Sequence, residues 1–247
     1  AQVEDDMALL FTTDEEGAGG CCVNRFIETG QCQYYEQVIV AEPTGCRAIL
    51  GHRGFLSVKT WFKGVPGHSS EARALRENAN HRLARWAGDT LRLAEQKKQT
   101  EDDPGTCINI GLIDGGTKSN VIAGQAFVHW SARLRPGESN QDFLREVQGC
   151  DSDGKDTVWE VPFSGDPLPA TGQNDRLARS FCAANNVEIG EPVDFWTEAA
   201  LFSAAGVPAM VLGPGNIEQA HVADEWVAVD QLERALEIYT RLVKKNA

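Results

Sequence analysis

The sequence predicts an α/β protein whose chain is interrupted by a second, α+β module. Strands and helices alternate over residues 6–45 and again over 174–245, as they do in an α/β sheet. Between these parts the expected order is strand, helix, strand, strand, helix, strand, which is the ferredoxin-like split pattern. The Pro- and Gly-rich stretch SGDPLPATG then leads back to the α/β pattern. The expected domains are therefore 1–47 and 164–247, which form the α/β part, and 48–163, which forms the inserted module.

The first α/β part opens with the apolar run DMALLFTT (6–13), which predicts a buried strand. A glycine-rich turn follows, and CCVNRFIETG (21–30) then predicts a short helix that Gly30 ends. The second apolar strand lies in EQVIVAEPTG (36–45) and ends at Glu42.

The inserted module is predicted from its change of hydrophobic period. The stretch AILGHRGFLSVKTWFKG (48–64) alternates like a half-exposed strand, and we expect it at an open edge of the sheet. Residues 78–98 have helical spacing, with Leu83 and Trp86 among the apolar positions. The remaining elements expected in the module are strands at 106–116 and 124–136, a helix at 139–150 that Ser139 caps, and a strand at 156–163.

The returning α/β part is expected to contain two helices and one strand. Residues 174–186 and 230–245 have helical spacing, and 207–212 predicts a short buried strand between them. Open α/β sheets bind ligands at the carboxyl ends of their strands, so the loops that leave these strands are the places to look for a site.

Composition narrows the class of partner. The chain has 247 residues and a net charge of −13, with a pI near 4.8. Nucleic acids and anionic membranes require a positive face, so we expect neither as a partner. No apolar run reaches the ~20 residues of a membrane span. The odd count of seven cysteines without a C-x-x-C pair indicates reduced thiols and a cytoplasmic protein.

Three acids, Asp14, Glu15 and Glu16, stand directly before the glycines of the first turn. A glycine turn into a helix is typical of a phosphate loop, but these acids would repel a phosphate. Glu42 ends the next strand, and His221 lies in the loop after a later one. Carboxylates and an imidazole at strand ends suit Zn, Mn or Co. The pattern therefore favours a metal site over a nucleotide site.

Six motifs in order resemble those of the M20 metallopeptidase family, over essentially the whole chain. They are TTDEEGAGG, AEPTGC, GHRGFLSVKTWFKGVPGHSS, DGGTKSNVIAG, ARLRPGES and GPGNIEQAHVADEW. Within the family the chain is most similar to the deacetylases of acetylornithine and acetylcitrulline, and VDFWTEAALFSAAG resembles the citrulline branch. The resemblance implies a zinc-peptidase-like catalytic α/β domain and a ferredoxin-like lid that forms a homodimer.

The family resemblance assigns roles to the strand-end residues. It implies that Glu15 is the general base that activates a water molecule. Glu16 and His221 are then ligands of one metal ion, and Glu42 is a ligand of the other. The implied cofactor is two Zn²⁺ ions per complete subunit, with Co²⁺ as an alternative. A carboxylate that stays off the metal can take the proton of the water and return it to the leaving amine.

The resemblance also assigns three residues of the inserted module. His68 in GVPGHSS resembles the lid histidine that enters the active site of the partner subunit and stabilises the oxyanion; its alternative is an ordinary turn histidine. Asn120 and Arg135 resemble the residues that bind the α-carboxylate of the substrate, and a guanidinium fork suits that group. Asn120 has the alternative role of shaping a turn between two strands.

The chain departs from the family pattern at its start. M20 enzymes carry an upstream His-x-Asp pair and an aspartate that bridges both metals. We therefore expect the present 247 residues to be the carboxyl-terminal portion of such an enzyme, with an incomplete set of metal ligands. The implied function is hydrolysis of an N-acetyl amino acid, acetylornithine or acetylcitrulline, in arginine biosynthesis. The alternatives are another M20 activity, such as dipeptide cleavage or desuccinylation, and a non-catalytic fragment that dimerises through the lid.

Overall fold

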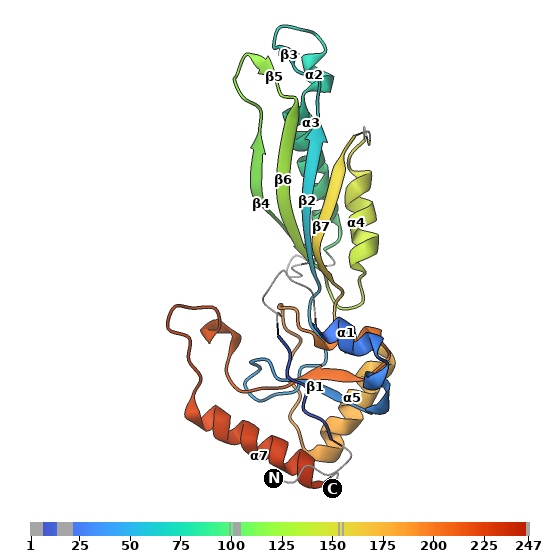
Figure 1. Ribbon diagram of the computed structural model, residues 1–247, viewed down its shortest axis with the longest axis vertical. Helices are drawn as coiled ribbons and strands as arrows, with labels where there is room; N and C mark the ends of the chain where they lie inside the picture. The colour runs from blue at the N-terminus through green and yellow to red at the C-terminus, as the bar shows by residue number, and fades with distance from the viewer. Residues whose placement is uncertain are drawn as a thin grey trace. The chain divides into compact units, whose positions relative to one another are not determined.

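The computed structural model describes residues 7–13, 22–98, 100, 105–152, 154 and 156–245. It confirms the mixed α/β class and divides the chain into two compact units (Figure 1). Residues Gly54–Pro167 form one unit, and the chain before Gly54 and after Pro167 forms the other. The boundaries thus lie a few residues beyond the 48 and 163 expected from the sequence. None of the described helices combines the length and the apolar character needed to cross a bilayer.

The unit Gly54–Pro167 is built on a four-stranded antiparallel sheet in the order β4-β6-β2-β7. This order is the ferredoxin-like arrangement that follows from strand–helix–strand–strand–helix–strand. The main elements in chain order are β2 (Phe55–Lys63), α3 (Ala79–Gln96), β4 (Cys107–Gly115), β6 (Gln125–Arg133), α4 (Asn140–Gly149) and β7 (Val158–Gly165).

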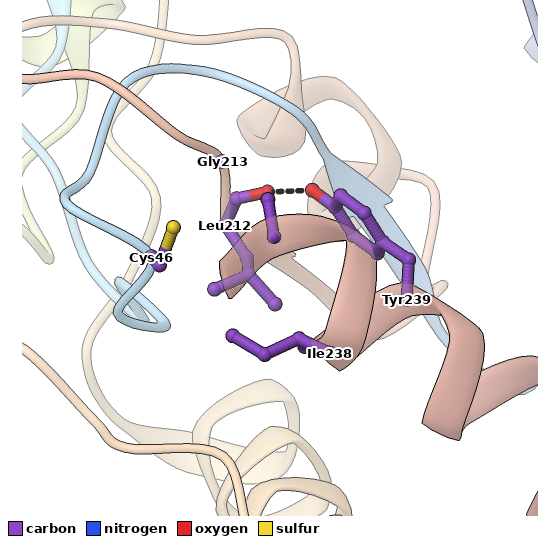
Figure 2. Close-up of a pocket in the computed structure, with 6 residues that line it drawn as sticks. Cys46, Leu212, Gly213, Ile238 and Tyr239 are labelled. Carbon is purple, nitrogen blue, oxygen red and sulfur yellow. Dashed lines mark hydrogen bonds between the residues drawn. The ribbon is translucent and has the colours of Figure 1, made fainter. Parts of the chain in front are cut away.

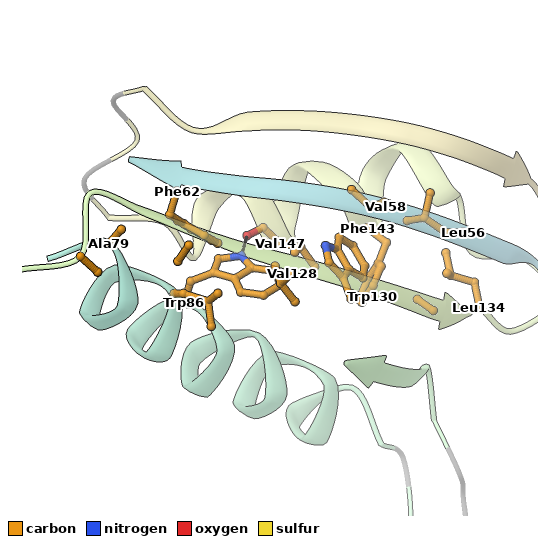
Figure 3. Close-up of a cluster of buried hydrophobic side chains, with 14 residues drawn as sticks. Leu56, Val58, Phe62, Ala79, Trp86, Val128, Trp130, Leu134, Phe143 and Val147 are labelled. Carbon is orange, nitrogen blue, oxygen red and sulfur yellow. Dashed lines mark hydrogen bonds between the residues drawn. The ribbon is translucent and has the colours of Figure 1, made fainter. Parts of the chain in front are cut away.

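The core of this unit lies between the sheet and its helices (Figure 3). Alternate residues of β2 and β6 are buried, as the period of two requires, and their apolar side chains meet α3 and α4. The Trp86 ring of α3 packs in a tilted arrangement against Trp130 at 5.9 Å and against Phe62 at 5.5 Å, measured between ring centroids. The Trp86 Nε1 donates to the carbonyl of Val147 at 3.1 Å, which satisfies the one polar atom of the ring.

The place of β2 in the sheet corrects one expectation. The alternating strand of 48–64 was expected at an open edge, but β2 begins at Phe55 and lies between β6 and β7. Its alternation comes from a covered face and an uncovered face of the same sheet. The open edges are instead β4 and β7.

A small substructure joins one end of this unit. Strands β3 (Gly67–His68) and β5 (Val121–Ile122) pair with each other, with His68 opposite Val121. The short helix α2 (Ala74–Glu77) follows β3 and leads into α3, which Asn78 caps through its side chain. This substructure lies at the end of β6 that starts with Gln125.

The second unit contains a two-stranded parallel sheet and four α-helices among the described residues. Strand β1 (Val38–Val40) pairs with β8 (Ala209–Val211). The other elements are α1 (Cys22–Glu28), a 3₁₀ helix η1 (Gln31–Tyr34), α5 (Gly172–Asn185), α6 (Ala199–Ala204), a 3₁₀ helix η2 (Ile217–Gln219) and α7 (Val229–Lys245). The predicted helices at 21–30, 174–186 and 230–245 are confirmed, whereas α6 and both 3₁₀ helices were not predicted.

The expected buried strand at 6–13 is wrong for its described part, residues 7–13. These residues have no regular structure, and the large side chains of Leu9, Leu10 and Phe11 are 72%, 47% and 87% exposed. The described sheet of β1 and β8 does not extend to them, and an apolar run without a neighbouring strand cannot complete its backbone hydrogen bonds as a strand.

Helix α7 packs against the end of β8 (Figure 2). The Tyr239 hydroxyl donates to the carbonyl of Leu212, and burial raises the pKa of this phenol to about 12. Cys46, Leu212 and Ile238 close round this contact and leave no space for a water molecule. This hollow is therefore a packing feature that fixes the loop after β8, and it is not a binding site.

Candidate active site

The residues predicted for the site fall in three places. Glu15 and Glu16 lie outside the described residues. Glu42 and His221 belong to the unit with the parallel sheet, and His68 and the other two lid residues belong to the unit Gly54–Pro167.

Glu42 lies two residues after the end of β1, in a loop that is tied to the loop after β8. The strands are parallel, so their carboxyl ends meet at one edge of the sheet. Leu212 N donates to Val40 O at 2.9 Å, and a side chain on Gly213 would approach the Glu42 carbonyl to 2.6 Å. Only glycine allows the two loops to come this close. Glu42 itself is half-buried in this crossing.

His221 follows η2 on the loop that leaves β8. Asn216 and Gln219 form a capping box that fixes this 3₁₀ turn. His221 is exposed and has a left-handed backbone, with φ of 58°, and its N–H donates to Glu225 Oε2 at 3.2 Å. Glu42 and His221 therefore sit on loops that leave neighbouring strand ends.

Metal-ligating side chains are sparse in the part of the chain that the structure describes. That part contains no group of three or more His, Cys, Asp or Glu side chains placed to hold an ion. Glu42 and His221 are a carboxylate and an imidazole, the donor types that zinc and cobalt accept. These two residues thus fit part of a metal site, and the remaining ligand predicted in this chain, Glu16, lies outside the described residues.

Glu198 is a buried acid in the same unit that the sequence did not identify. It is 6% exposed at the start of α6, and Thr12 Oγ1 donates to its Oε2 at 3.4 Å. Thr12 stands two positions before Asp14, so this contact connects α6 to the segment that leads into the acids. The signal in the sequence was an acid among the apolar residues of FWTEAALF, because a buried carboxylate requires a partner.

His68 and Asn120 are brought together by the small sheet of β3 and β5. Ser69 N donates to Asn120 O at 3.1 Å, directly beside the pairing of His68 with Val121. The His68 Nδ1 contacts Ser70 Oγ at 2.8 Å and Ser70 N at 3.3 Å. The imidazole is exposed at the tip of its unit.

Arg135 belongs to a turn that begins α4. Gly137 adopts φ of 89°, and Glu138 N closes the turn onto Arg135 O at 3.0 Å. The Glu138 carboxylate accepts from Arg135 N at 2.8 Å, from Arg135 Nη2 at 3.3 Å and from Thr106 Oγ1 at 2.6 Å. Although burial opposes it, these hydrogen bonds hold the pKa of Glu138 below its usual range. The guanidinium is thus set beside a fixed carboxylate.

Asn120 and Arg135 lie at opposite ends of β6. Asn120 precedes the strand and Arg135 follows it, and the nine residues Gln125–Arg133 extend over roughly 27 Å at about 3.4 Å per residue. One chain therefore does not bring both side chains to the same carboxylate. If both bind one substrate molecule, they come from two subunits.

His52 is buried and serves the structure of its unit. It is fully buried, its Nδ1 donates to Arg53 O at 2.8 Å, and Thr197 Oγ1 contacts its Nε2 at 3.1 Å. Desolvation lowers its pKa to about 4. A neutral imidazole with both nitrogens occupied explains why this histidine matches no ligand motif.

Comparison with known proteins agrees with the fold. Residues 50–150 match the family model of the M20 peptidase dimerisation domain. The aminopeptidase PepT from Bacillus cereus superposes with a TM-score of 0.67 at 15% identity, over 94% of this chain and 62% of that one. A dipeptidase from Saccharomyces cerevisiae gives a TM-score of 0.58 at 13% identity, over 90% and 62%. At these identities the likeness establishes the fold.

Sequence comparison establishes the family. The chain is 39% identical over 247 aligned residues to the N-acetyl-L-citrulline deacetylase of Xanthomonas campestris pv. campestris, which covers 97% of this chain and 67% of that protein. It is 29% identical to the acetylornithine deacetylase of Aliivibrio fischeri, over 96% of this chain and 64% of that protein. The chain thus spans about two thirds of the length of these relatives. It belongs to the M20 family of metallopeptidases and deacylases.

Proposed function

We propose that the protein hydrolyses the amide bond of an N-acetyl amino acid and releases acetate and the free amino acid. The observation that carries the proposal is the 39% identity to a citrulline deacetylase over 97% of this chain. The lower identity of 29% to an acetylornithine deacetylase favours acetylcitrulline as the substrate. Either reaction serves arginine biosynthesis, and the free cysteines fit the reducing cytoplasm.

The strand-end residues supply the metal and proton chemistry in this proposal. Glu16 and His221 hold one ion and Glu42 the other, with zinc as the first choice and cobalt as the second. A bound ion polarises the acetyl carbonyl and lowers the pKa of a water molecule toward neutrality. Glu15 accepts the proton of the attacking water and returns it to the amine nitrogen as the C–N bond breaks. The arrangement of the β1 and β8 loops supports the nearness of Glu42 and His221.

The lid residues bind the other parts of the substrate. The His68 imidazole donates a hydrogen bond to the oxyanion that forms on the acetyl carbon. Arg135 binds the α-carboxylate through its guanidinium, and Asn120 assists from the far end of β6. Because His68 and Asn120 lie together and Arg135 lies a strand's length away, we propose that the pair comes from the partner subunit. The complete site then requires a homodimer.

Substrate turnover tests the function. The measurement uses a chain extended at its N-terminus with the His-x-Asp pair and the bridging aspartate, and compares acetylcitrulline, acetylornithine and N-acetylmethionine. The proposal expects the highest kcat/KM for acetylcitrulline. Equal values for all three would remove the side-chain preference, and hydrolysis of dipeptides alone would replace the deacetylase with a peptidase.

The amide analogue of the best substrate tests Arg135. Replacing the α-carboxylate by a neutral amide should raise KM in the parent enzyme. In the Arg135→Ala variant the acid and the amide should have similar KM, because the group that distinguishes them is gone. Unchanged discrimination in this variant would assign carboxylate binding to another residue.

A further inference from the structure

His68 is an exposed histidine in a turn whose backbone N–H groups are hydrogen-bonded to other protein groups. Its backbone N–H donates to Glu71 Oε1 at 2.6 Å, and the next residue, Ser69, donates to Asn120 O at 3.1 Å. Exposed turn residues usually satisfy their backbone groups with water. The backbone on both sides of this imidazole is therefore held by protein groups.

A three-residue brace holds the His68 turn. Glu71 Oε2 accepts from Arg73 Nε at 2.7 Å, and Arg73 also donates to the carbonyls of Val65 and Pro66, each at 2.9 Å. Glu77 Oε2 accepts a further bond from Arg73 at 2.8 Å. The Arg73 contact holds the pKa of Glu71 below its ordinary value, so the carboxylate stays charged at neutral pH.

Gly67 is the position at which this brace crosses the chain. A Cβ there would lie 2.0 Å from Arg73 Nη2 and 2.4 Å from Glu71 Oε1, so no other residue fits without displacing the ion pair. The glycine before His68 thus allows the brace to pass over the backbone. The brace fixes the position of the His68 backbone, and the contacts of the ring with Ser70 determine the orientation of the imidazole.

The ring contacts of His68 identify its tautomer. A backbone N–H can only donate, so the Ser70 N–H bond to Nδ1 makes Nδ1 an acceptor. The Ser70 hydroxyl, at 2.8 Å from the same nitrogen, then donates as well. In the neutral ring one nitrogen accepts and the other carries the proton, which leaves the proton of His68 on Nε2.

We propose that Ser70 is a positioning residue that holds His68 as the Nε2–H tautomer, so that this nitrogen donates a hydrogen bond to the oxyanion of the substrate. The inference rests on the function proposed for His68 and names the group that prepares it. An imidazole in the other tautomer would present a lone pair to the negative oxygen and would repel it. Ser70 therefore acts through His68 and does not itself touch the substrate.

The tautomer is measured directly in the 247-residue chain by long-range ¹H–¹⁵N NMR of the histidine rings. The measurement is made at mildly alkaline pH. The His68→Ala spectrum assigns the signals of His68. We expect Nδ1 unprotonated in the parent chain. In Ser70→Ala the backbone N–H still donates to Nδ1, so we expect both nitrogens to shift measurably, but only part of the way, toward the value of a freely exchanging ring.

Two further variants control the NMR measurement. Ser70→Thr keeps the hydroxyl and should restore the parent spectrum. Ser69→Ala removes a neighbouring hydroxyl for which the described residues show no hydrogen bond, and it should change nothing. A protonated Nδ1 in the parent chain, or identical spectra for Ser70→Ala and the parent, overturns the proposal.

Kinetics in the extended chain test the use of this tautomer. Removing the donor itself with His68→Ala should lower kcat by about 10²- to 10³-fold. Ser70→Ala should lower kcat about five- to tenfold, the rate equivalent of one ordinary hydrogen bond, with KM unchanged and with recovery in Ser70→Thr. A rise in KM alone would indicate a structural role for Ser70 and would overturn the proposal.

The two assays separate the two claims. If His68→Ala keeps full turnover while Ser70→Ala still shifts the tautomer, the function assigned to His68 is wrong, and with it the catalytic use of the tautomer. If His68→Ala loses turnover while Ser70→Ala changes neither the spectrum nor kcat, the function stands and the role of Ser70 is wrong.

Discussion

Buried His52 shows how contacts that are distant in sequence decide what a titratable residue does. Its ring lies between Arg53 O and Thr197 Oγ1, the second of which is 145 positions away. The sequence indicated only a histidine without a ligand motif. The same limit applies to Glu198, whose observed partner, Thr12, is 186 positions away, and to Glu138, whose partner Thr106 precedes it by 32.

The lowered pKa of His52 makes stability depend on pH. Its folded pKa is about 4 against an ordinary value of 6.5, so between these values the unfolded chain binds the proton more tightly. The contribution of the neutral ring is complete above pH 6.5 and is lost as the pH falls toward 4. Between pH 7 and 4.5 we expect this residue alone to lower the free energy of unfolding by about 2 kcal/mol.

Urea unfolding at the two pH values measures this effect. The difference between pH 7 and pH 4.5 should be about 2 kcal/mol smaller in His52→Gln than in the parent chain, whatever the variant does to stability at pH 7. An equal difference in both proteins would mean that His52 does not titrate in this range.

The acids before the glycine turn are expected to separate by role. In the extended chain Glu15→Gln should lower turnover by about 10²- to 10⁴-fold, the usual effect of losing a general base, and should keep the metal. Glu16→Gln and His221→Ala should lose metal and activity together, because both are proposed ligands. Elemental analysis after dialysis, paired with turnover, checks both expectations. Normal turnover or an emptied site in Glu15→Gln would reverse the roles of the two glutamates.

Element by element, the inserted unit was more predictable than the rest. The burial alternation of β2 and β6 is visible in the sequence, and so is the helical spacing of α3, because each element has one face toward the core. The order of strands in the sheet is set by pairing between distant segments, and alternation does not report it. For this reason β2 was expected at an edge and lies in the centre.

Short elements were harder to predict in the other unit. Strands β1 and β8 have three residues each, so their period is not measurable, and α6 has six. The apolar run 7–13 has the composition of a strand but no strand beside it among the described residues. Apolar composition makes a segment able to form a strand, but a strand forms only where a neighbouring strand completes its backbone hydrogen bonds.

The junction between β2 and α3 depends on Gly64. A Cβ at this position would lie 2.4 Å from Ala123 O, 2.5 Å from Glu77 O and 2.7 Å from Ala79 N, all of them backbone atoms. Gly64→Ala should therefore lower the free energy of unfolding by about 3 kcal/mol or more. Backbone atoms cannot rotate away as a flexible side chain can.

Gly88→Ala is the matched control for this prediction. Gly88 lies within α3, and a Cβ there would have no atom within 4 Å. Alanine in a helix interior should raise the free energy of unfolding by about 0.5–1 kcal/mol. Thermal or urea unfolding checks both variants, and destabilisation of similar size in the two would show that the crowding at Gly64 has no special effect.

For the whole molecule, the open edge β4 is the surface we expect to form the dimer. Leu112 and Ile113 of this strand are 55% and 56% exposed, and Leu91 on the neighbouring helix α3 is 48% exposed. An edge strand with apolar side chains pairs readily with another chain. Residues 50–150, which match the dimerisation-domain model, include both elements.

Light scattering of the edge variants tests this assembly. At tens of micromolar the parent chain should have about twice the monomer mass of 26.9 kDa. Ile113→Lys should yield a monomer, because it buries a charge at the proposed interface. Val161→Lys places the same charge on the opposite edge strand, β7, and should leave the dimer intact. A monomeric parent, or loss of the dimer only in Val161→Lys, would contradict the choice of β4.

The chain enters and leaves the inserted unit at neighbouring points. A Cβ on Gly54 would lie 2.9 Å from Pro167 Cδ, and one on Gly51 would lie 2.6 Å from the Cβ of Ala170. The two ends of the inserted unit therefore lie side by side. The two chain segments of the other unit that flank it also lie side by side. In topological terms the 114 residues of Gly54–Pro167 are one loop with its ends already joined. Replacing the inserted unit by a short linker would therefore cost little loop-closure entropy. The inserted unit and the remaining chain are each candidates for independent folding, and for exchange between proteins as separate gene segments.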